Sequence, residues 1–206
     1  KMKGKFITLE GPDGSGKTTV SKIVVEQLQM EGYKVLLTRE PGGIDIAEQI
    51  RKIILDTNNI TMDARTEALL YAARRQHLVE KVAPALNDGY IVICDRFVDS
   101  SLVYQGVGRK IGIEEVYQIN QFAIGNIKPD ATIFFDLPYE VGLARINNGE
   151  RVADRLDLES DDFHKDVYNG YMTICEKYAE RITKIDASKT IDEVVVQVIN
   201  VIKSKL

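Results

Sequence analysis

The sequence predicts an α/β fold in which a parallel sheet of five strands carries helices on both faces. Three observations support this prediction: five short apolar runs, segments of helical periodicity between them, and a glycine-rich phosphate-binding loop after the first run. The runs are continuous rather than alternating, which is typical of parallel strands that are covered on both faces. No internal repeat or Pro/Gly/Ser-rich linker divides the 206 residues, so we expect residues 1–206 to form a single domain.

The strands are expected at 6–9, 35–37, 91–94, 132–135 and 182–185. The segments between them are long enough to be the crossover helices that parallel strands require. Two of the helices have clear boundaries in the sequence. One runs from Asp63 to about Asn87 and is closed by Gly89, and the last one begins at Thr190, which forms a capping box with Glu193.

Residues 11–18 form a complete phosphate-binding loop of the pattern G-x-x-x-x-G-K-[ST], with an expected strand before it and an amphipathic stretch after it. The backbone N–H groups of such a loop and the positive end of the following helix cradle phosphate oxygens. Lys17 would reach the outer phosphates and Thr18 would hold Mg²⁺. The chain is therefore predicted to have a P-loop NTPase fold and to bind a nucleoside triphosphate with Mg²⁺. The phosphate contacts would come from Gly11, Pro12, Asp13, Gly14, Ser15, Gly16, Lys17 and Thr18.

Charged residues also follow the later strands of the predicted sheet. Ligands of open α/β sheets bind beyond the carboxyl ends of the strands, so these residues are candidates for the site. Asp95 directly follows the third apolar run and matches the Walker-B carboxylate that supports Mg²⁺. Alternatively, Asp95 caps a helix or pairs with Arg96. Asp136 and Asp186 end the fourth and fifth runs and are expected on the same rim.

Four arginines, Arg51, Arg74, Arg75 and Arg96, fall near this rim although the chain carries a net charge of −4. A planar guanidinium group binds phosphate through two parallel hydrogen bonds, so this gathering indicates a second, phosphorylated ligand. Tyr71 and Arg75 lie four residues apart on one expected helix and share a face. An aromatic ring beside a guanidinium group suits a nucleobase stacked above a monophosphate. The alternative is that Tyr71 belongs to the core and that Arg75 is a solvated charge.

Two further polar segments are candidates for contacts with ligands. Residues 100–106 could read the edge of a base through hydrogen bonds. The segment at about 145–157 carries arginines and lies between two expected helices, which is typical of a lid that closes over a triphosphate and excludes water. The alternative is an ordinary charged loop.

Composition narrows the class of protein. The net charge of −4 and the pI near 5.4 argue against general binding to nucleic acid. No apolar run is long enough to span a membrane and the N-terminus lacks a signal-peptide pattern, so we expect a cytoplasmic protein. Cys94 and Cys175 are interpreted as reduced core residues. His77 and His164 lack the spacing of metal ligands and are expected to be structural.

Together these motifs resemble those of the thymidylate kinases, and the resemblance spans almost the whole chain. It is carried by the phosphate loop, by Thr-Arg-Glu-Pro-Gly-Gly at 38–43, by Asp-Arg-Phe at 95–97 and by Ser-Ser-Leu-Val-Tyr-Gln-Gly at 100–106, in that order. The resemblance implies the nucleoside monophosphate kinase form of the P-loop fold. It also implies a homodimer that converts ATP and dTMP to ADP and dTDP with Mg²⁺ in its site.

The resemblance implies a role for each matching residue of the acceptor site. Tyr71 would stack on thymine, at a position where the family usually has Phe. Asp13, where many bacterial members have Glu, would receive the sugar 3′-hydroxyl, and Glu40 would support the metal and the sugar side. The base would be contacted by Arg75 and Gln105, the base and sugar pocket lined by Ser101 and Tyr104, and the monophosphate held by Arg51 and Arg96.

The resemblance also implies that the lid supplies a catalytic arginine. Some family members, eukaryotic ones among them, place an arginine inside the phosphate loop, whereas this chain has Gly14 directly after Asp13. The bacterial type instead takes the charge from the lid, here from Arg151 or Arg155, and spacing does not choose between them. Arg145, close by, would bind ATP. The expected catalytic residues are Asp13, Lys17, Arg96, Arg151 and Arg155.

Two other functions fit part of the sequence. A deoxynucleoside kinase would use the same donor loop, but it would need a general base at a 5′-hydroxyl and would have less use for an arginine cluster. Thymidine and dTMP, compared as acceptors, separate this alternative from the first. A GTPase switch would need a guanine-reading Asn-Lys-x-Asp stretch, which the sequence does not contain.

Overall fold

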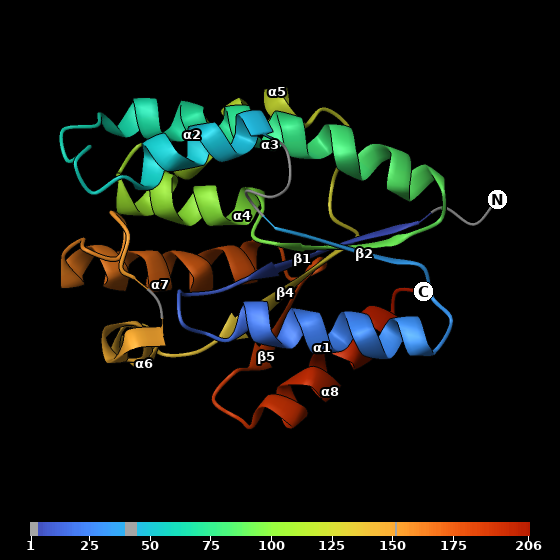
Figure 1. Ribbon diagram of the computed structural model, residues 1–206. Helices are drawn as coiled ribbons and strands as arrows, with labels where there is room; N and C mark the ends of the chain where they lie inside the picture. Colours follow the sequence, from blue (N-terminus) through green and yellow to red (C-terminus); the bar gives the residue numbers. More distant parts are fainter. Residues whose placement is uncertain (1–3, 40–44, 151) are drawn as a thin grey trace.

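Five parallel strands form one sheet in the order β2-β3-β1-β4-β5 (Figure 1). The computed structural model describes residues 4–39, 45–150 and 152–206, without the side chains of 77, 78, 149 and 150. Every strand runs one or two residues beyond its apolar run and ends in a charged residue, and the predicted fold class is confirmed. The strands are β1 (Lys5–Glu10), β2 (Val35–Arg39), β3 (Ile91–Asp95), β4 (Ala131–Asp136) and β5 (Ile182–Asp186).

Helices cover both faces of the sheet (Figure 1). Successive residues of a strand point to opposite faces, so Ile7 of β1 packs in the cluster formed with α1 and α8, whereas Phe6 packs in the cluster formed with α3 and α5. A third cluster joins α7 to Phe134 of β4. Burial on both faces explains why the apolar runs are continuous. These helices are α1 (Lys17–Met30), α3 (Ala64–Asn87), α5 (Ile113–Ile124), α7 (Asp161–Lys177) and α8 (Ile191–Lys203).

The helix boundaries follow the capping residues that the sequence predicts. Asp63 Oδ1 accepts a hydrogen bond from the backbone N–H of Arg65 at 2.9 Å and so caps α3. Thr190 and Glu193 form the reciprocal capping box at the start of α8, with bonds of 3.3 Å and 3.0 Å. Gly89, past the end of α3, has a φ of 81°, a conformation that glycine adopts without strain.

Shorter helices follow β2, β3 and β4 at the carboxyl edge of the sheet. The turn η1 is π-helical, because the N–H of Arg109 donates to the carbonyl of Tyr104, five residues earlier, at 2.9 Å. None of the helices that the structure describes, even the 24 residues of α3, has the length and apolar character to cross a membrane. The short elements are α2 (Asp45–Leu55), α4 (Val98–Ser101), η1 (Leu102–Gly108), α6 (Tyr139–Arg145) and η2 (Ile146–Glu150).

Candidate active site

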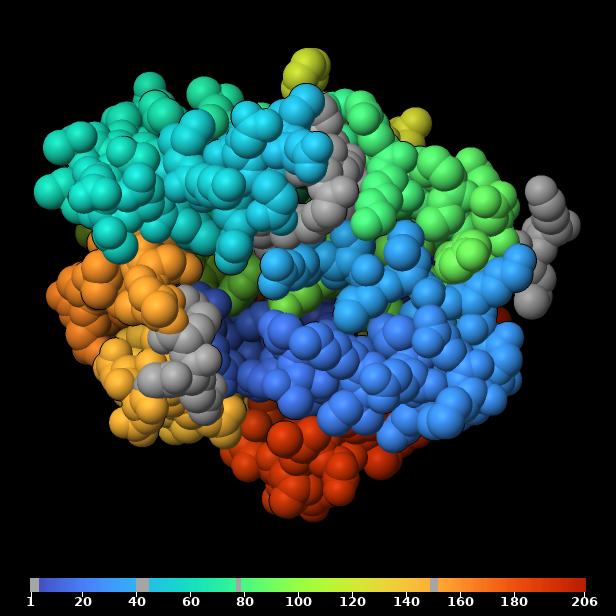
Figure 2. All heavy atoms as spheres, viewed as in Figure 1, coloured from blue at the N-terminus to red at the C-terminus, as the bar shows by residue number. Residues whose placement is uncertain are grey.

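A cavity of about 700 Å³ lies beyond the carboxyl ends of the central strands. In Figure 2 the atoms of α2, in cyan, and those of α1, in blue, stand on opposite sides of this hollow. The phosphate loop forms one end of the cavity, and arginines and a tyrosine of α2 and α3 form the other. The predicted site residues that line it are Asp13, Gly14, Ser15, Gly16, Lys17, Thr18, Arg51, Tyr71, Arg75, Asp95, Arg96, Tyr104 and Gln105.

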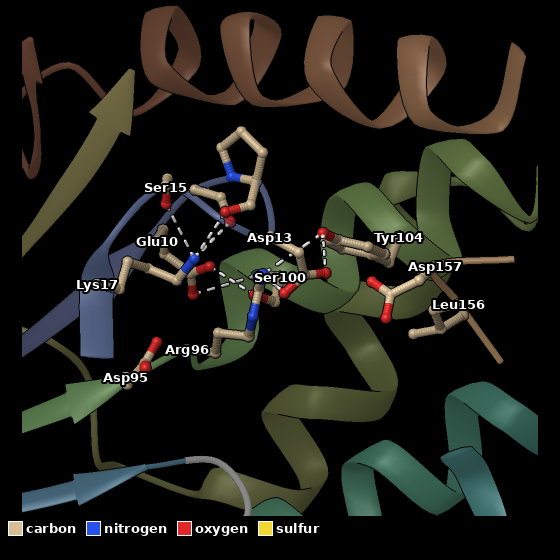
Figure 3. A network of polar contacts seen from close by, with 12 residues as sticks. Glu10, Asp13, Ser15, Lys17, Asp95, Arg96, Ser100, Tyr104, Leu156 and Asp157 are labelled. Carbon is tan, nitrogen blue, oxygen red and sulfur yellow. Dashed lines mark hydrogen bonds and ion pairs between the residues drawn. The ribbon is translucent and has the colours of Figure 1, made fainter. Parts of the chain in front are cut away.

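The lysine of the phosphate loop is folded onto the loop itself. Lys17 is the first residue of α1, and its Nζ donates to the carbonyls of Gly11 at 3.0 Å and Pro12 at 2.9 Å and to Ser15 Oγ at 3.2 Å (Figure 3). Burial, and then the positive charge of Arg96, lower the pKa of Lys17 to about 8. The ammonium group is therefore still charged at neutral pH and lies where an anion would bind the loop.

Helix α6 touches the phosphate loop backbone to backbone. Gly14 has a φ of 75°, and a Cβ atom on it would collide with the carbonyl of Gly142 in α6. Arg145, at the end of the same helix, donates from Nη1 to the carbonyl of Gly14 at 2.9 Å. A side chain at position 14 has no room in this packing, so position 14 cannot supply a positive charge to a phosphate bound at the loop.

Thr18 and Asp95 bring two oxygen-bearing side chains together beside the phosphate loop. Thr18 Oγ1 donates to Asp95 Oδ2 at 3.1 Å. Asp95 Oδ1 is buried and has no hydrogen-bond partner among the described residues. Within the same ranges, no group of three or more His, Cys, Asp and Glu residues gathers into a metal cage. One carboxylate and one hydroxyl beside a phosphate site suit Mg²⁺, which takes few protein ligands and completes its shell with phosphate and water.

Arg96 lines the cavity and contacts four polar side chains, of which Asp13, Ser100 and Tyr104 are seen in Figure 3. Its Nη2 pairs with Asp13 Oδ1 at 2.8 Å, and its Nη1 donates to Ser100 Oγ at 3.0 Å and to Tyr171 Oη at 3.2 Å. The guanidinium group also lies 5.3 Å from the ring centre of Tyr104. Arg96 has a φ of 68°, which is strained for a residue with a side chain and is typical of functional sites.

Sequence reasoning missed Glu10, the last residue of β1. Its Oε1 accepts from the backbone N–H of Phe97 at 2.8 Å, and its Oε2 accepts from Ser100 Oγ at 2.6 Å and from Tyr171 Oη at 3.0 Å. Burial, and then the negative charge of Asp99, raise the pKa of Glu10 to about 7. A carboxylate directly before the phosphate loop, at the end of a buried strand, was the available signal in the sequence.

The far end of the cavity combines a tyrosine with two buried arginines. The guanidinium carbons of Arg74 and Arg75 lie 4.9 Å and 5.8 Å from the ring centre of Tyr71. Arg75 Nη1 also donates to Ser101 Oγ at 2.6 Å and to Asn120 Oδ1 at 2.9 Å. These contacts hold the guanidinium group in place beside a ring face that lines the cavity.

A buried carboxylate, Glu67 of α3, joins the cavity wall to the lid segment. It accepts from Gln105 Nε2 at 2.8 Å and from Arg109 Nε at 3.1 Å, and it forms a short ion pair with Arg155. Burial alone would raise the pKa of Glu67, but the hydrogen bonds from Arg109, Gln105 and Arg155 lower it, so Glu67 stays ionised. Arg155 also donates to the carbonyl of Ile54 at 2.7 Å and does not line the cavity.

Several predicted residues differ from expectation in where they lie. Ser101 is buried against Arg75, and its neighbour Ser100 lines the cavity in its place. The cavity wall also contains residues to which the sequence analysis gave no role of their own, among them Arg39 of the motif at 38–43. Arg51 lines the cavity with a buried Nε that has no hydrogen-bond partner in the described ranges, as suits a residue that binds an anion.

Other expectations concern residues away from the cavity or outside the described ranges. Glu40 and Arg151 lie outside the residues that the structure describes. Asp136 accepts from Tyr168 Oη at 2.9 Å, Asp186 accepts from the N–H of Ser188 at 3.0 Å, and neither residue lines the cavity. The expected core cysteines, Cys94 and Cys175, are buried and free, which confirms their interpretation.

The chain is similar over its whole length to proteins of one known family. A sequence model of the family described as thymidylate kinase matches residues 9–198. The thymidylate kinase of Clostridium novyi (strain NT) is 58% identical over 194 residues, which are 93% of this chain and 95% of that protein. The thymidylate kinase of Bacillus velezensis is 57% identical over 207 residues, 100% of this chain and 98% of that protein. That of Geobacillus sp. (strain WCH70) is 57% identical over 195 residues, 94% of this chain and 93% of its own.

Proposed function

The chain belongs to the thymidylate kinase family, and on that premise we propose how its residues transfer the γ-phosphoryl group of ATP to dTMP. The observation that carries the proposal is a cavity with a phosphate loop at one end and a tyrosine flanked by arginines at the other. In this proposal residues 1–206 form a single kinase domain whose segment at about 145–157 is a lid. The products are ADP and dTDP.

The donor end binds the triphosphate of ATP through the phosphate loop. Backbone N–H groups of the loop and the positive end of α1 bind the phosphates, and Lys17 neutralises the outer ones. Thr18 and Asp95 hold Mg²⁺, a role supported by the unpartnered Oδ1 of Asp95 beside the loop. When bound, Mg²⁺ supplies positive charge to the phosphate oxygens. Arg145 extends this end, because it already contacts the loop at Gly14.

The acceptor end binds dTMP by its three parts. Arg96 and Arg51 bind the monophosphate, Tyr71 stacks on the thymine ring, and Asp13 receives the sugar 3′-hydroxyl. The buried arginines beside Tyr71 and the ion pair that joins Arg96 to Asp13 of the phosphate loop support this arrangement. The remaining contacts come from Arg75 and Gln105 to the base, Tyr104 and Glu40 to the sugar side, and Ser101 through its hydrogen bond with Arg75.

The reaction needs placement and charge neutralisation rather than a nucleophile of the protein. A phosphate oxygen of dTMP attacks the γ-phosphorus in line, and its low pKa removes the need for a strong base. A lid arginine neutralises the moving group. We assign this role to Arg151, because Arg155 is engaged in a buried ion pair with Glu67 and lies outside the cavity wall.

A coupled assay of ADP release tests the proposed function. In the presence of ATP and Mg²⁺, the protein should release ADP and form dTDP when dTMP is the acceptor. This reaction should be far faster than that with thymidine or with other nucleoside monophosphates as acceptors. Turnover of thymidine in preference to dTMP would indicate a deoxynucleoside kinase. The proposed function would be refuted if no dTDP formed.

Two parts of the expectation stay predictions. The homodimer follows from the resemblance alone, and sedimentation of the purified chain tests it. A cytoplasmic location likewise stays a prediction, and cell fractionation tests it.

A further inference from the structure

Glu10 reaches Arg96 through two hydroxyl groups. The carboxylate ends β1, directly before the phosphate loop, and is 1% exposed. Its Oε2 lies 2.6 Å from Ser100 Oγ and 3.0 Å from Tyr171 Oη. The same two hydroxyl oxygens lie 3.0 Å and 3.2 Å from Arg96 Nη1 and 3.2 Å from each other. Figure 3 shows Glu10, Ser100 and Arg96 side by side at the base of the site.

The direction of donation along this path follows from chemistry while Glu10 is ionised, which is the case above its pKa of about 7. An ionised carboxylate only accepts hydrogen bonds, and a guanidinium group only donates them. Each hydroxyl has a single hydrogen, which it donates to Glu10, so that its lone pairs face Arg96. Burial raises the pKa of Tyr171 well above its usual value, which keeps that hydrogen in place.

Glu10 also holds the backbone that carries Arg96. Its Oε1 accepts from the N–H of Phe97 at 2.8 Å and from the N–H of Ser100 at 3.2 Å. The N–H of Arg96 donates to the carbonyl of Leu9 at 2.8 Å. The strained φ of 68° at Arg96 is therefore maintained by bonds from the end of β1 on both sides of the residue.

We propose that Glu10 and Tyr171 are positioning residues that fix the Arg96 guanidinium group for the phosphate of the acceptor nucleotide. Neither residue lines the cavity, so both act through Arg96. Prearrangement of a flexible arginine lowers the entropy lost when it binds its ligand. The inference rests on the proposed function in one respect, namely that Arg96 binds the acceptor phosphate.

Tyr171→Phe tests the inference with the smallest change. The variant keeps a ring whose centre lies 4.9 Å from that of Phe134 and removes only the hydroxyl group. We expect the KM for dTMP to rise about tenfold or more, as for the loss of a hydrogen bond to a charged group, and the KM for ATP to change less than about twofold. Tyr168→Phe is the matched control. It removes a tyrosine hydroxyl from the same helix, and this hydroxyl donates to Asp136 at 2.9 Å rather than to the Glu10 site. Both KM values of this control should stay within about twofold of the parent protein.

A double-mutant cycle with Arg96→Lys separates positioning from a structural role. In the Arg96→Lys background, Tyr171→Phe should change the KM for dTMP less than about twofold, because the guanidinium group it positions is gone. The inference is overturned if Tyr171→Phe leaves the KM for dTMP unchanged in the parent protein, or if its effect is equally large in the Arg96→Lys background. If Arg96→Lys itself leaves this KM unchanged, the acceptor role of Arg96 fails instead, and with it that part of the proposed function.

Discussion

Replacement of Glu10 by Gln should make the protein relatively more stable at alkaline pH. Burial, and then Asp99, raise the pKa of Glu10 from 4.5 to about 7, against the opposing attraction of Arg96. Between these two values the unfolded chain releases a proton that the folded chain keeps. Because the folded state then binds more protons, the contribution of Glu10 to the free energy of unfolding falls as the pH rises.

The size of the effect follows from the interval between the two pKa values. A carboxyl group with a pKa of 4.5 in the unfolded chain and about 7 in the folded protein costs about 3 kcal/mol of stability once the pH exceeds both values. Most of this cost develops between pH 5 and pH 8. A glutamine in the same place keeps an oxygen that accepts from the N–H of Phe97 and carries no charge.

Urea denaturation at pH 5, 6, 7 and 8 measures the effect. The difference in unfolding free energy between Glu10→Gln and the parent protein should shift in favour of the variant by about 2–3 kcal/mol across this range. Glu26→Gln, which replaces an exposed carboxylate on α1, controls for the general loss of one negative charge. A difference that stays constant with pH would show that Glu10 is ionised throughout, and the reasoning on its burial would be refuted.

Three other predictions concern the lid, the metal and the loop. Arg151→Ala should lower kcat by about 10³. Arg155→Ala should lower kcat less than about tenfold, but it should lower the free energy of unfolding by about 3 kcal/mol because it breaks a buried ion pair. An equal fall of kcat in both variants would contradict the assignment of roles. Asp95→Asn should raise the Mg²⁺ concentration for half-maximal rate about tenfold or more, and an unchanged Mg²⁺ titration would remove Asp95 from the metal site. Gly14→Ala should lower the free energy of unfolding by about 2 kcal/mol or more, measured in a thermal or urea melt. This loss should exceed that of Gly32→Ala, because Gly32 shares a positive φ but has open space around it. Equal losses would mean that the contact between the loop and α6 yields to an added methyl group.

The sequence was sufficient for the sheet, for the phosphate loop and for Asp95 at the end of β3. Continuous apolar runs and short-range capping signals are local, so the strands, both ends of α3, the start of α8 and the position of Lys17 and Asp95 could all be predicted. Arg51, Tyr71 and Arg75 belong to helices that reach the cavity through tertiary packing, which local sequence patterns do not specify. That these residues lie together could be predicted only from the order and spacing of whole motifs.

The residues that sequence reasoning missed or left open depend on contacts between distant parts of the chain. Glu10 accepts a hydrogen bond from Tyr171, which lies 161 positions later in the chain. Arg155 is drawn from the cavity wall by Glu67, 88 positions earlier. The choice between Ser100 and Ser101 depends on about 100° of rotation around a helix, which a polar run alone does not specify.

The contact between Gly14 and Gly142 links the place of the positive charge to the architecture of the fold. The space that an arginine at position 14 would need is filled by the main chain of α6. The charge that we propose to come from the lid is compatible with this packing, whereas an arginine at position 14 is not. An arginine at position 14 would therefore require α6 to move away from the loop, and the single substitution Gly14→Arg would break the contact between these two segments.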